Sequence, residues 1–84
     1  MNGVTVVDVR VNSFNITYDE VTEATGGYHI QIFRDGSVDK ELSTMNTNVI
    51  IDKMDAYNVE FFVQVAFITD LGTSQYSEQV SSSK

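Results

Sequence analysis

The segment from Phe61 to Ile68 constrains the fold most, because its side chains alternate with a period of two. Apolar residues fall at every second position, at Phe61, Val63, Val65 and Phe67. The intervening positions hold Phe62, Gln64, Ala66 and Ile68. Successive side chains of a strand point to opposite faces of a sheet. The segment therefore predicts a long strand whose first set of side chains lies in a core, while the second set points away from it.

Similar strand-like runs recur along the whole chain. They cover residues 4–11, 14–18, 28–33, 38–42, 49–51, 61–68 and 76–80, of which the fourth is the weakest. Turn-forming pairs such as Asp35-Gly36 separate these runs. No segment of helical length keeps apolar residues at the spacing of a helix face. Seven strands separated by turns predict an all-β fold, a seven-stranded β-sandwich.

Three of the other runs also alternate, and each is expected to turn one face to the core. The sets that share a face are Phe14, Ile16 and Tyr18, then Tyr28, Ile30 and Ile32, then Val7, Val9 and Val11. The chain has 84 residues and no cysteine, so one domain must be held together by packing alone. We expect this domain to span residues 4–80, with residues 1–3 and 81–84 as terminal extensions or linker.

The charge balance excludes two classes of partner. Twelve acidic residues against five basic ones give a formal net charge of −7. Nucleic acids and anionic membranes are bound through clustered Lys and Arg, so neither is an expected partner. The chain also lacks the run of about eighteen apolar residues that inserts into a membrane. As an isolated domain it is expected to be a monomer.

No catalytic, metal or cofactor site is predicted. His29 is the only histidine, and strand parity places it on the outer face, away from Tyr28 and Ile30. Histidine catalysis needs an oriented nucleophile or carboxylate beside the ring, and the sequence marks none. The acidic residues gather as Asp19, Glu20 and Glu23 and as Asp52 and Asp55, without the spacing of a calcium loop. We therefore expect a non-enzyme without a cofactor.

Two short motifs have mainly structural interpretations. Arg34-Asp35-Gly36 has the composition of a cell-attachment tripeptide in the wrong order, and its Asp-Gly pair favours a hairpin turn. Asn15-Ile16-Thr17 is a formal acceptor for N-glycosylation, and Asn15 is expected to point outward.

The residues of these runs resemble a fibronectin type III domain over almost the whole chain, from Val4 to Val80. The resemblance rests on Phe14-x-Ile16-x-Tyr18, Gly27-Tyr28-x-Ile30-x-Ile32, Val49-x-Ile51-x-x-Met54, Phe61-x-Val63-x-Val65, and Gly72 with Ser77. It implies an immunoglobulin-like β-sandwich, in which two sheets face each other across one core. It also implies that Tyr18, Tyr28, Ile30, Met54 and Val63 all contribute to that core.

The chain departs from the family pattern at several positions. Tyr18 stands where the family usually has tryptophan, there is no proline, and the corner tyrosine is replaced by Phe61. A hydrogen bond worth about 0.5–1.5 kcal/mol in the family is then missing, unless Tyr57 supplies a substitute.

Two surfaces are candidates for binding a partner. The resemblance makes the third and sixth strands neighbours, so the outward Phe33 and Phe62 are expected on one exposed face, where a contiguous apolar patch would mark an interface. Ile68 is a further outward apolar residue. The loop from Thr69 to Gln75, which includes Leu71, corresponds to one that family members use for binding, although a simple connection is the favoured interpretation.

Two functions remain open at this point. The first is a non-catalytic spacer in a larger extracellular or cell-surface protein, such as a secreted carbohydrate-active enzyme, with adjacent modules of the same chain as its partners. The second is a module that recognises a protein or a glycan through the Thr69–Gln75 loop or the Phe33/Phe62 face.

Overall fold

The computed structural model describes residues 2–55 and 57–82, and this part of the chain consists of strands, turns and loops without a helix. The strands are β1 (Thr5–Arg10), β2 (Ser13–Thr17), β3 (Gly27–Arg34), β4 (Ser37–Thr44), β5 (Asn48–Asp52), β6 (Phe62–Thr69), β7 (Gly72–Thr73) and β8 (Val80–Ser81). Each predicted run from the first to the sixth is present, and the fourth is longer than expected.

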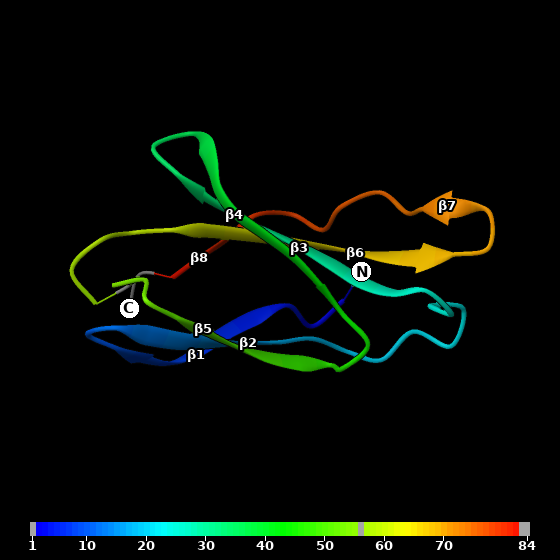
Figure 1. Ribbon diagram of the computed structural model, residues 1–84, viewed down its shortest axis with the longest axis horizontal. Coiled ribbons are helices and arrows are strands. Elements are labelled where there is room, and N and C mark those ends of the chain that lie inside the picture. Colours follow the sequence, from blue (N-terminus) through cyan, green and yellow to red (C-terminus); the bar gives the residue numbers. More distant parts are fainter. Residues whose placement is uncertain (1, 56, 83–84) are drawn as a thin grey trace.

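The strands form two antiparallel sheets that face each other (Figure 1). One sheet has the order β1-β2-β5, and the other has the order β4-β3-β6-β7, with β8 also pairing with β6. The molecule is elongated, with extents of 38 × 23 × 19 Å and a radius of gyration of 12.2 Å. This arrangement confirms the predicted all-β, immunoglobulin-like sandwich.

A single apolar core fills the space between the sheets. Its buried residues are Phe14, Ile16, Tyr18, Tyr28, Ile30, Ile32, Ile51, Met54, Phe61, Val63 and Val65. The five residues expected there from the family resemblance are all members. The rings of Phe14 and Phe61 stack across the core with centroids 6.1 Å apart. At about 1.5–3 kcal/mol for each large buried side chain, this cluster is the main stabilising element.

A β-bulge in β1 overturns the prediction that Val7, Val9 and Val11 share a core face. The β1–β2 register shifts between Val7 and Arg10, and Asp8 has a left-handed φ of 52°. The extra residue reverses the parity of the strand after it. Val6 and Val9 consequently pack on the core and Val7 does not, while Val11 is 61% exposed because it lies in the turn after β1.

The last strand also differs from its prediction. Residues 76–80 were expected to form one strand, but regular pairing with β6 survives only in the short β7 and β8. Three serines between and beyond these pieces replace the ladder. Each serine pairs with one residue in or next to β6, and the pairs are Ser74 with Phe67, Ser77 with Val65, and Ser82 with Phe61. In each pair the serine hydroxyl accepts a bond from the partner's amide, and the serine amide donates to the partner's carbonyl.

The serine pairs shift the register by one residue between Ser74 and Ser77 and again before Val80. Ser74, Ser77 and Val80 lie opposite Phe67, Val65 and Val63. At each step the last strand therefore advances three residues while β6 advances two. Each shift is a bulge that the hydroxyl stabilises, because it accepts a bond that a carbonyl would otherwise accept. Ser81 and the buried Ser82, expected in a terminal linker, therefore belong to the folded structure.

Two turns set the ends of the sheets. Asp35 and Gly36 both have positive φ, 51° and 83°, as the tight hairpin between β3 and β4 requires. Between β5 and β6, the Asp55 carboxylate accepts bonds from the amide nitrogens of Tyr57 and Asn58 and from the Asn58 side chain. This carboxylate thus organises the link that precedes the buried Phe61.

Candidate binding face

Several polar side chains lie together on the outer face of the five-stranded sheet, where the sequence had pointed only to His29. Because β3 lies between β4 and β6, each outward residue of β3 has a neighbour on both sides. The register gives three rows across these strands: Ser43, His29 and Ala66, then Glu41, Gln31 and Gln64, then Val38, Phe33 and Phe62. We call the first two rows, with Tyr76, the polar face, and the third the apolar row.

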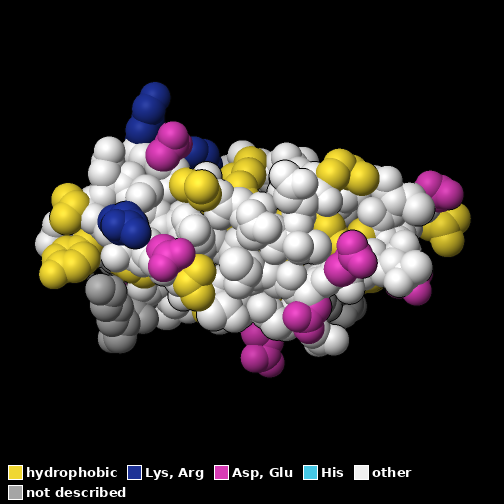
Figure 2. Space-filling model, turned by 90° about the horizontal axis from the view of Figure 1, so that it is seen from below, with side chains coloured by type: hydrophobic (Ala, Val, Ile, Leu, Met, Phe, Trp, Pro, Cys, Tyr) yellow, Lys and Arg dark blue, Asp and Glu magenta, His cyan; other side chains and the backbone are white. Residues whose placement is uncertain are grey.

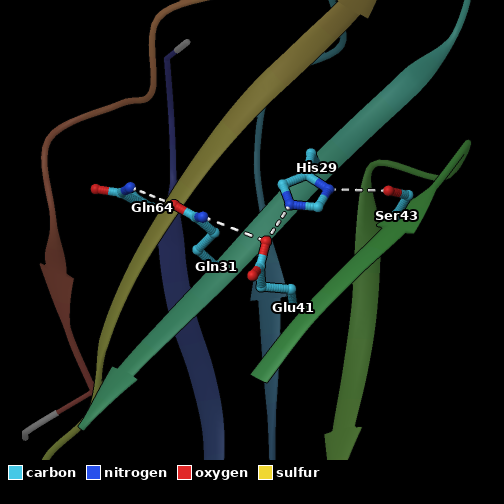
Figure 3. Close-up of polar contacts among 5 residues, drawn as sticks. All are labelled: His29, Gln31, Glu41, Ser43 and Gln64. Carbon is cyan, nitrogen blue, oxygen red and sulfur yellow. Dashed lines mark hydrogen bonds and ion pairs between the residues drawn. The ribbon is translucent and has the colours of Figure 1, made fainter. Parts of the chain in front are cut away.

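The side chains of the polar face form one connected network (Figure 3). The two ring nitrogens of His29 lie 3.0 Å from Ser43 Oγ and 2.8 Å from Glu41 Oε2, with Nδ1 toward the serine and Nε2 toward the carboxylate. Gln31 Nε2 donates to the same oxygen of Glu41 at 3.3 Å, and Gln64 Nε2 donates to Gln31 Oε1 at 2.6 Å. The network therefore ties together three strands on their outer side.

Tyr76 belongs to this face although it lies in the irregular last strand. Its ring packs edge-on against the His29 ring, with centroids 6.1 Å apart. The bulges at Ser74 and Ser77 lie on either side of Tyr76, and bulges are a common means of redirecting a side chain. Ala66, on the outer side of β6 beside His29, is fully buried.

The electrostatics of the polar face follow from these contacts. The hydrogen bonds from His29 and then Gln31 lower the pKa of the Glu41 carboxyl below its ordinary value. Partial burial, with the nearby negative charge of Glu41, raises the pKa of the Tyr76 hydroxyl. At neutral pH Glu41 is therefore a carboxylate and Tyr76 a neutral phenol.

The order Ser43–His29–Glu41 is that of a nucleophile, a base and an orienting carboxylate. Since a carboxylate only accepts, a neutral His29 donates from Nε2 to Glu41 and accepts at Nδ1 from the Ser43 hydroxyl. Acyl transfer also needs amide donors aimed at a developing oxyanion. Strand amides lie in the plane of the sheet, whereas the Ser43 hydroxyl stands on its face. The geometry of these strands thus supplies a nucleophile–base pair without a backbone oxyanion hole beside it.

The predicted Phe33/Phe62 pair is present as the apolar row. The two residues are direct register partners on the outer face, and Val38 extends the row onto β4. Phe33 and Phe62 are half-buried and Val38 is exposed. The structure therefore brings these two candidate residues together at the start of β6, where Phe62 also pairs with Ser81.

The other candidate residues lie at the opposite end of β6. Ile68 pairs with Gly27, and the β6–β7 hairpin begins at Thr69. Leu71 sits in the turn and is 99% exposed, and Gln75 is exposed beyond β7. The candidate residues thus form two separate groups, the apolar row and the Thr69–Gln75 loop, and the polar face lies between them.

Sequence reasoning placed His29 on the correct face but missed its partners. Gln31 and Gln64 could have been found, because the parity of β3 and β6 points both outward and adjacent strands bring them together. The placement of Ser43 and Glu41 beside β3 depends on the register of β4. This register shifts where β4 passes from Ile32 to Phe33 of β3. Tyr76 had no usable signal, because the two serine bulges interrupt the parity of its strand.

The remaining motifs also have defined positions. Asn15 lies on the outer side of β2 and donates to the Asp8 carboxylate at 3.3 Å. Asp35 and Gly36 form the expected turn. Among the described residues, no group of three or more His, Cys, Asp or Glu side chains is arranged to hold a metal ion. The described part of the chain also contains no helix that is long and apolar enough to span a membrane.

The geometry defines an immunoglobulin-like β-sandwich. Its smaller sheet consists of β1, β2 and β5, and its larger sheet bears the polar face. Comparison with solved structures identifies the fold as that of a fibronectin type III domain, which confirms the resemblance seen in the sequence. No protein-family model and no curated protein sequence matches the chain.

Three structural neighbours illustrate the match. A structure described as a myokine aligns with a TM-score of 0.79 at 22% identity, over 95% of this chain and 89% of the other. Domains d3–d4 of the rat CD45 extracellular region align with a TM-score of 0.77 at 20% identity, over 95% of this chain and 47% of the other. The FN1–FN3 domains of chicken CNTN1 align with a TM-score of 0.77 at 15% identity, over 95% of this chain and 29% of the other. This chain thus spans less than half of the latter two.

Proposed function

We propose that the chain is a non-catalytic module of a larger extracellular or cell-surface protein, in which it holds neighbouring modules apart. A secreted carbohydrate-active enzyme is one such parent. The support is the geometry of the chain ends, together with the fold that the chain shares with domains of multidomain proteins.

The two ends of the described chain lie toward opposite ends of the long axis (Figure 1). The Asn2 carbonyl accepts a bond from the Asp19 amide, next to the β2–β3 link, whose Gly26 amide donates to Ile68 near the end of β6. Ser82 instead pairs with Phe61, just before β6 begins. Modules joined through these ends would therefore be displaced from each other along the sandwich.

The charge distribution follows the same axis. On the face seen in Figure 2, Lys and Arg side chains lie only toward the end that holds the C terminus, whereas Asp and Glu side chains extend to the other end. The links between β2 and β3 and between β6 and β7 carry Asp19, Glu20, Glu23 and Asp70. Copies or neighbours that meet end to end would thus present different charge to each other.

The spacer function can be tested in a chimera. The domain is inserted between a donor and an acceptor fluorescent protein, and energy transfer is compared with that of a Gly/Ser linker of 84 residues. A rigid spacer gives one narrow distance that does not change with salt, whereas the flexible linker gives a broad distribution. A broad distribution for the domain would contradict the proposal.

A second candidate function is recognition of a partner, and the outer face of the large sheet favours it. The face combines an apolar row with a preformed polar network, and both are accessible on one side of the sheet. The test is a Phe33→Ala/Phe62→Ala double variant compared with Leu71→Ala in the loop. If neither variant changes partner docking or self-association, this candidate fails.

A further inference from the structure

We propose that the polar face binds a neutral, hydroxyl-rich chain, a polysaccharide that lies across β4, β3 and β6. This inference deepens the recognition candidate and rests on it. It is carried by the side chains of Glu41, Gln31 and Gln64, which form a line perpendicular to the strands.

The line presents polar groups at a regular spacing. Its three residues are consecutive register partners, and neighbouring strands lie about 4.8 Å apart. Internal bonds use Glu41 Oε2, Gln31 Oε1 and one N–H each of Gln31 and Gln64. Glu41 Oε1, Gln64 Oε1 and the second N–H of each amide take part in none of these bonds. The line can therefore both donate to and accept from a ligand on its outer side.

Hydroxyl groups match this mixture of donors and acceptors. A hydroxyl donates one hydrogen bond and accepts two, so it pairs with a carboxylate oxygen, an amide oxygen or an amide N–H. The bonds among His29, Glu41 and Gln31 already hold the side chains in place, so a ligand would meet a face whose conformational entropy is largely lost before binding.

Charge separates this ligand class from its alternatives. The two polar rows contain the carboxylate of Glu41 and no Lys or Arg, and the whole chain carries −7. A phosphate- or sulfate-bearing ligand would be repelled. A mainly apolar partner would leave the carboxylate and the amides without hydrogen bonds, at a cost of about 1–3 kcal/mol for each group. A neutral polysaccharide avoids both penalties.

The Tyr76 ring adds an apolar edge to the line. It stands against His29, and its hydroxyl is a neutral phenol at physiological pH. Sugar rings have apolar C–H faces as well as hydroxyls, so an aromatic side chain beside hydrogen-bonding groups can contact both parts.

The experiment is a binding assay with defined neutral polysaccharides. The ¹⁵N-labelled domain is titrated with the hexasaccharides of cellulose, chitin, xylan and mannan, while the backbone and side-chain amide signals are followed by NMR. At least one of these ligands is expected to shift the Gln31 and Gln64 side-chain amides and the amide of Tyr76. A Gln31→Ala/Gln64→Ala variant is expected to bind it at least tenfold more weakly.

Two controls make the outcome decisive. Asn48→Ala removes an exposed amide from β5, in the other sheet, and it is expected to leave the affinity unchanged. A retained melting temperature in the Gln31→Ala/Gln64→Ala variant shows that a loss of binding is not a loss of folding. The inference is overturned if none of the four ligands shifts the polar face, or if the shifts map to the Thr69–Gln75 loop. Protein docking that depends on Phe33 and Phe62 would still leave the recognition candidate standing.

Discussion

At the scale of single residues, hydroxyl groups in the last strand replace backbone pairing. Ser77 Oγ accepts from the Val65 amide at 3.0 Å and donates to the Glu78 carbonyl at 3.1 Å. Serine is suited to this because its short side chain competes with the backbone for local hydrogen bonds. The sequence shows these serines but not their role, which appears only when β6 is placed beside them.

Replacing Ser77 by alanine removes the acceptor of a partly buried amide. We expect Ser77→Ala to lower the free energy of unfolding by about 1–3 kcal/mol, because the Val65 N–H is left without a partner. Urea denaturation measures the change. Ser37→Ala, at the exposed start of β4, serves as the control and is expected to stay within about 0.5 kcal/mol of the parent chain. Equal effects of the two substitutions would contradict the proposed role.

Tyr18 predicts a loss of stability at alkaline pH. Burial, and then the neighbouring Tyr28, raise its pKa to about 12 from the ordinary value of 10.0. Because the folded state holds this proton more tightly, its contribution is complete below pH 10 and disappears as the pH rises toward 12.

The variant Tyr18→Phe isolates this contribution. At pH 7 it loses the hydrogen bond to the Asn46 carbonyl, with an expected cost of about 0.5–1.5 kcal/mol. Between pH 10 and 12 it is expected to lose less stability than the parent chain in urea denaturation. The parent chain, measured over the same pH range, is the control. The same alkaline loss in Tyr18→Phe and in the parent would refute the assignment.

At the scale of strands, alternation predicted most of the fold and failed where a bulge changes parity. The core faces of β2, β3 and β6 followed directly from period two, whereas the pairing of the outward Phe33 with Phe62 also needed the strand order that the family resemblance implied. Val7 was misplaced because Asp8 adds a residue to β1, Val11 because it lies in the turn after that strand, and Tyr76 was missed because of the serine bulges. A bulge depends on the partner strand, so one strand's alternation cannot reveal it.

The bulge in β1 leads to a direct mutational test. Val9→Ala is expected to lower the free energy of unfolding by about 1–2 kcal/mol, because Val9 packs on the core. Val11→Ala should change it by less than about 0.5 kcal/mol, since Val11 is largely exposed. Thermal or urea denaturation distinguishes this from the unbulged register, in which both substitutions would cost about the same.

At the scale of the whole molecule, the edges of the large sheet are protected from pairing with other chains. On β4, Lys40 lies opposite the fully buried Ile32, so a charged side chain occupies a position on the inner face of an edge strand. The other edge is broken by the serine bulges. Inward charges and bulges both discourage edge-to-edge association.

Removing the inward charge should favour association. Lys40→Ile is expected to shift the protein toward dimers or larger species as its concentration rises, as measured by sedimentation velocity. Lys53→Ile, in the turn after β5, changes net charge equally and is expected to leave the protein monomeric. If both variants stay monomeric, Lys40 does not protect this edge.

The central claim is that one sandwich buries the Phe14/Phe61 core and presents His29, Gln31, Gln64 and Tyr76 together on its outer side. Nuclear Overhauser contacts in solution test this most directly. We expect contacts between the rings of Phe14 and Phe61, between the His29 and Tyr76 rings, and between the Gln31 and Gln64 side chains. Core contacts without those of His29 to Tyr76 or Gln31 to Gln64 would contradict the assembled face, and the absence of the Phe14–Phe61 contact would contradict the fold itself.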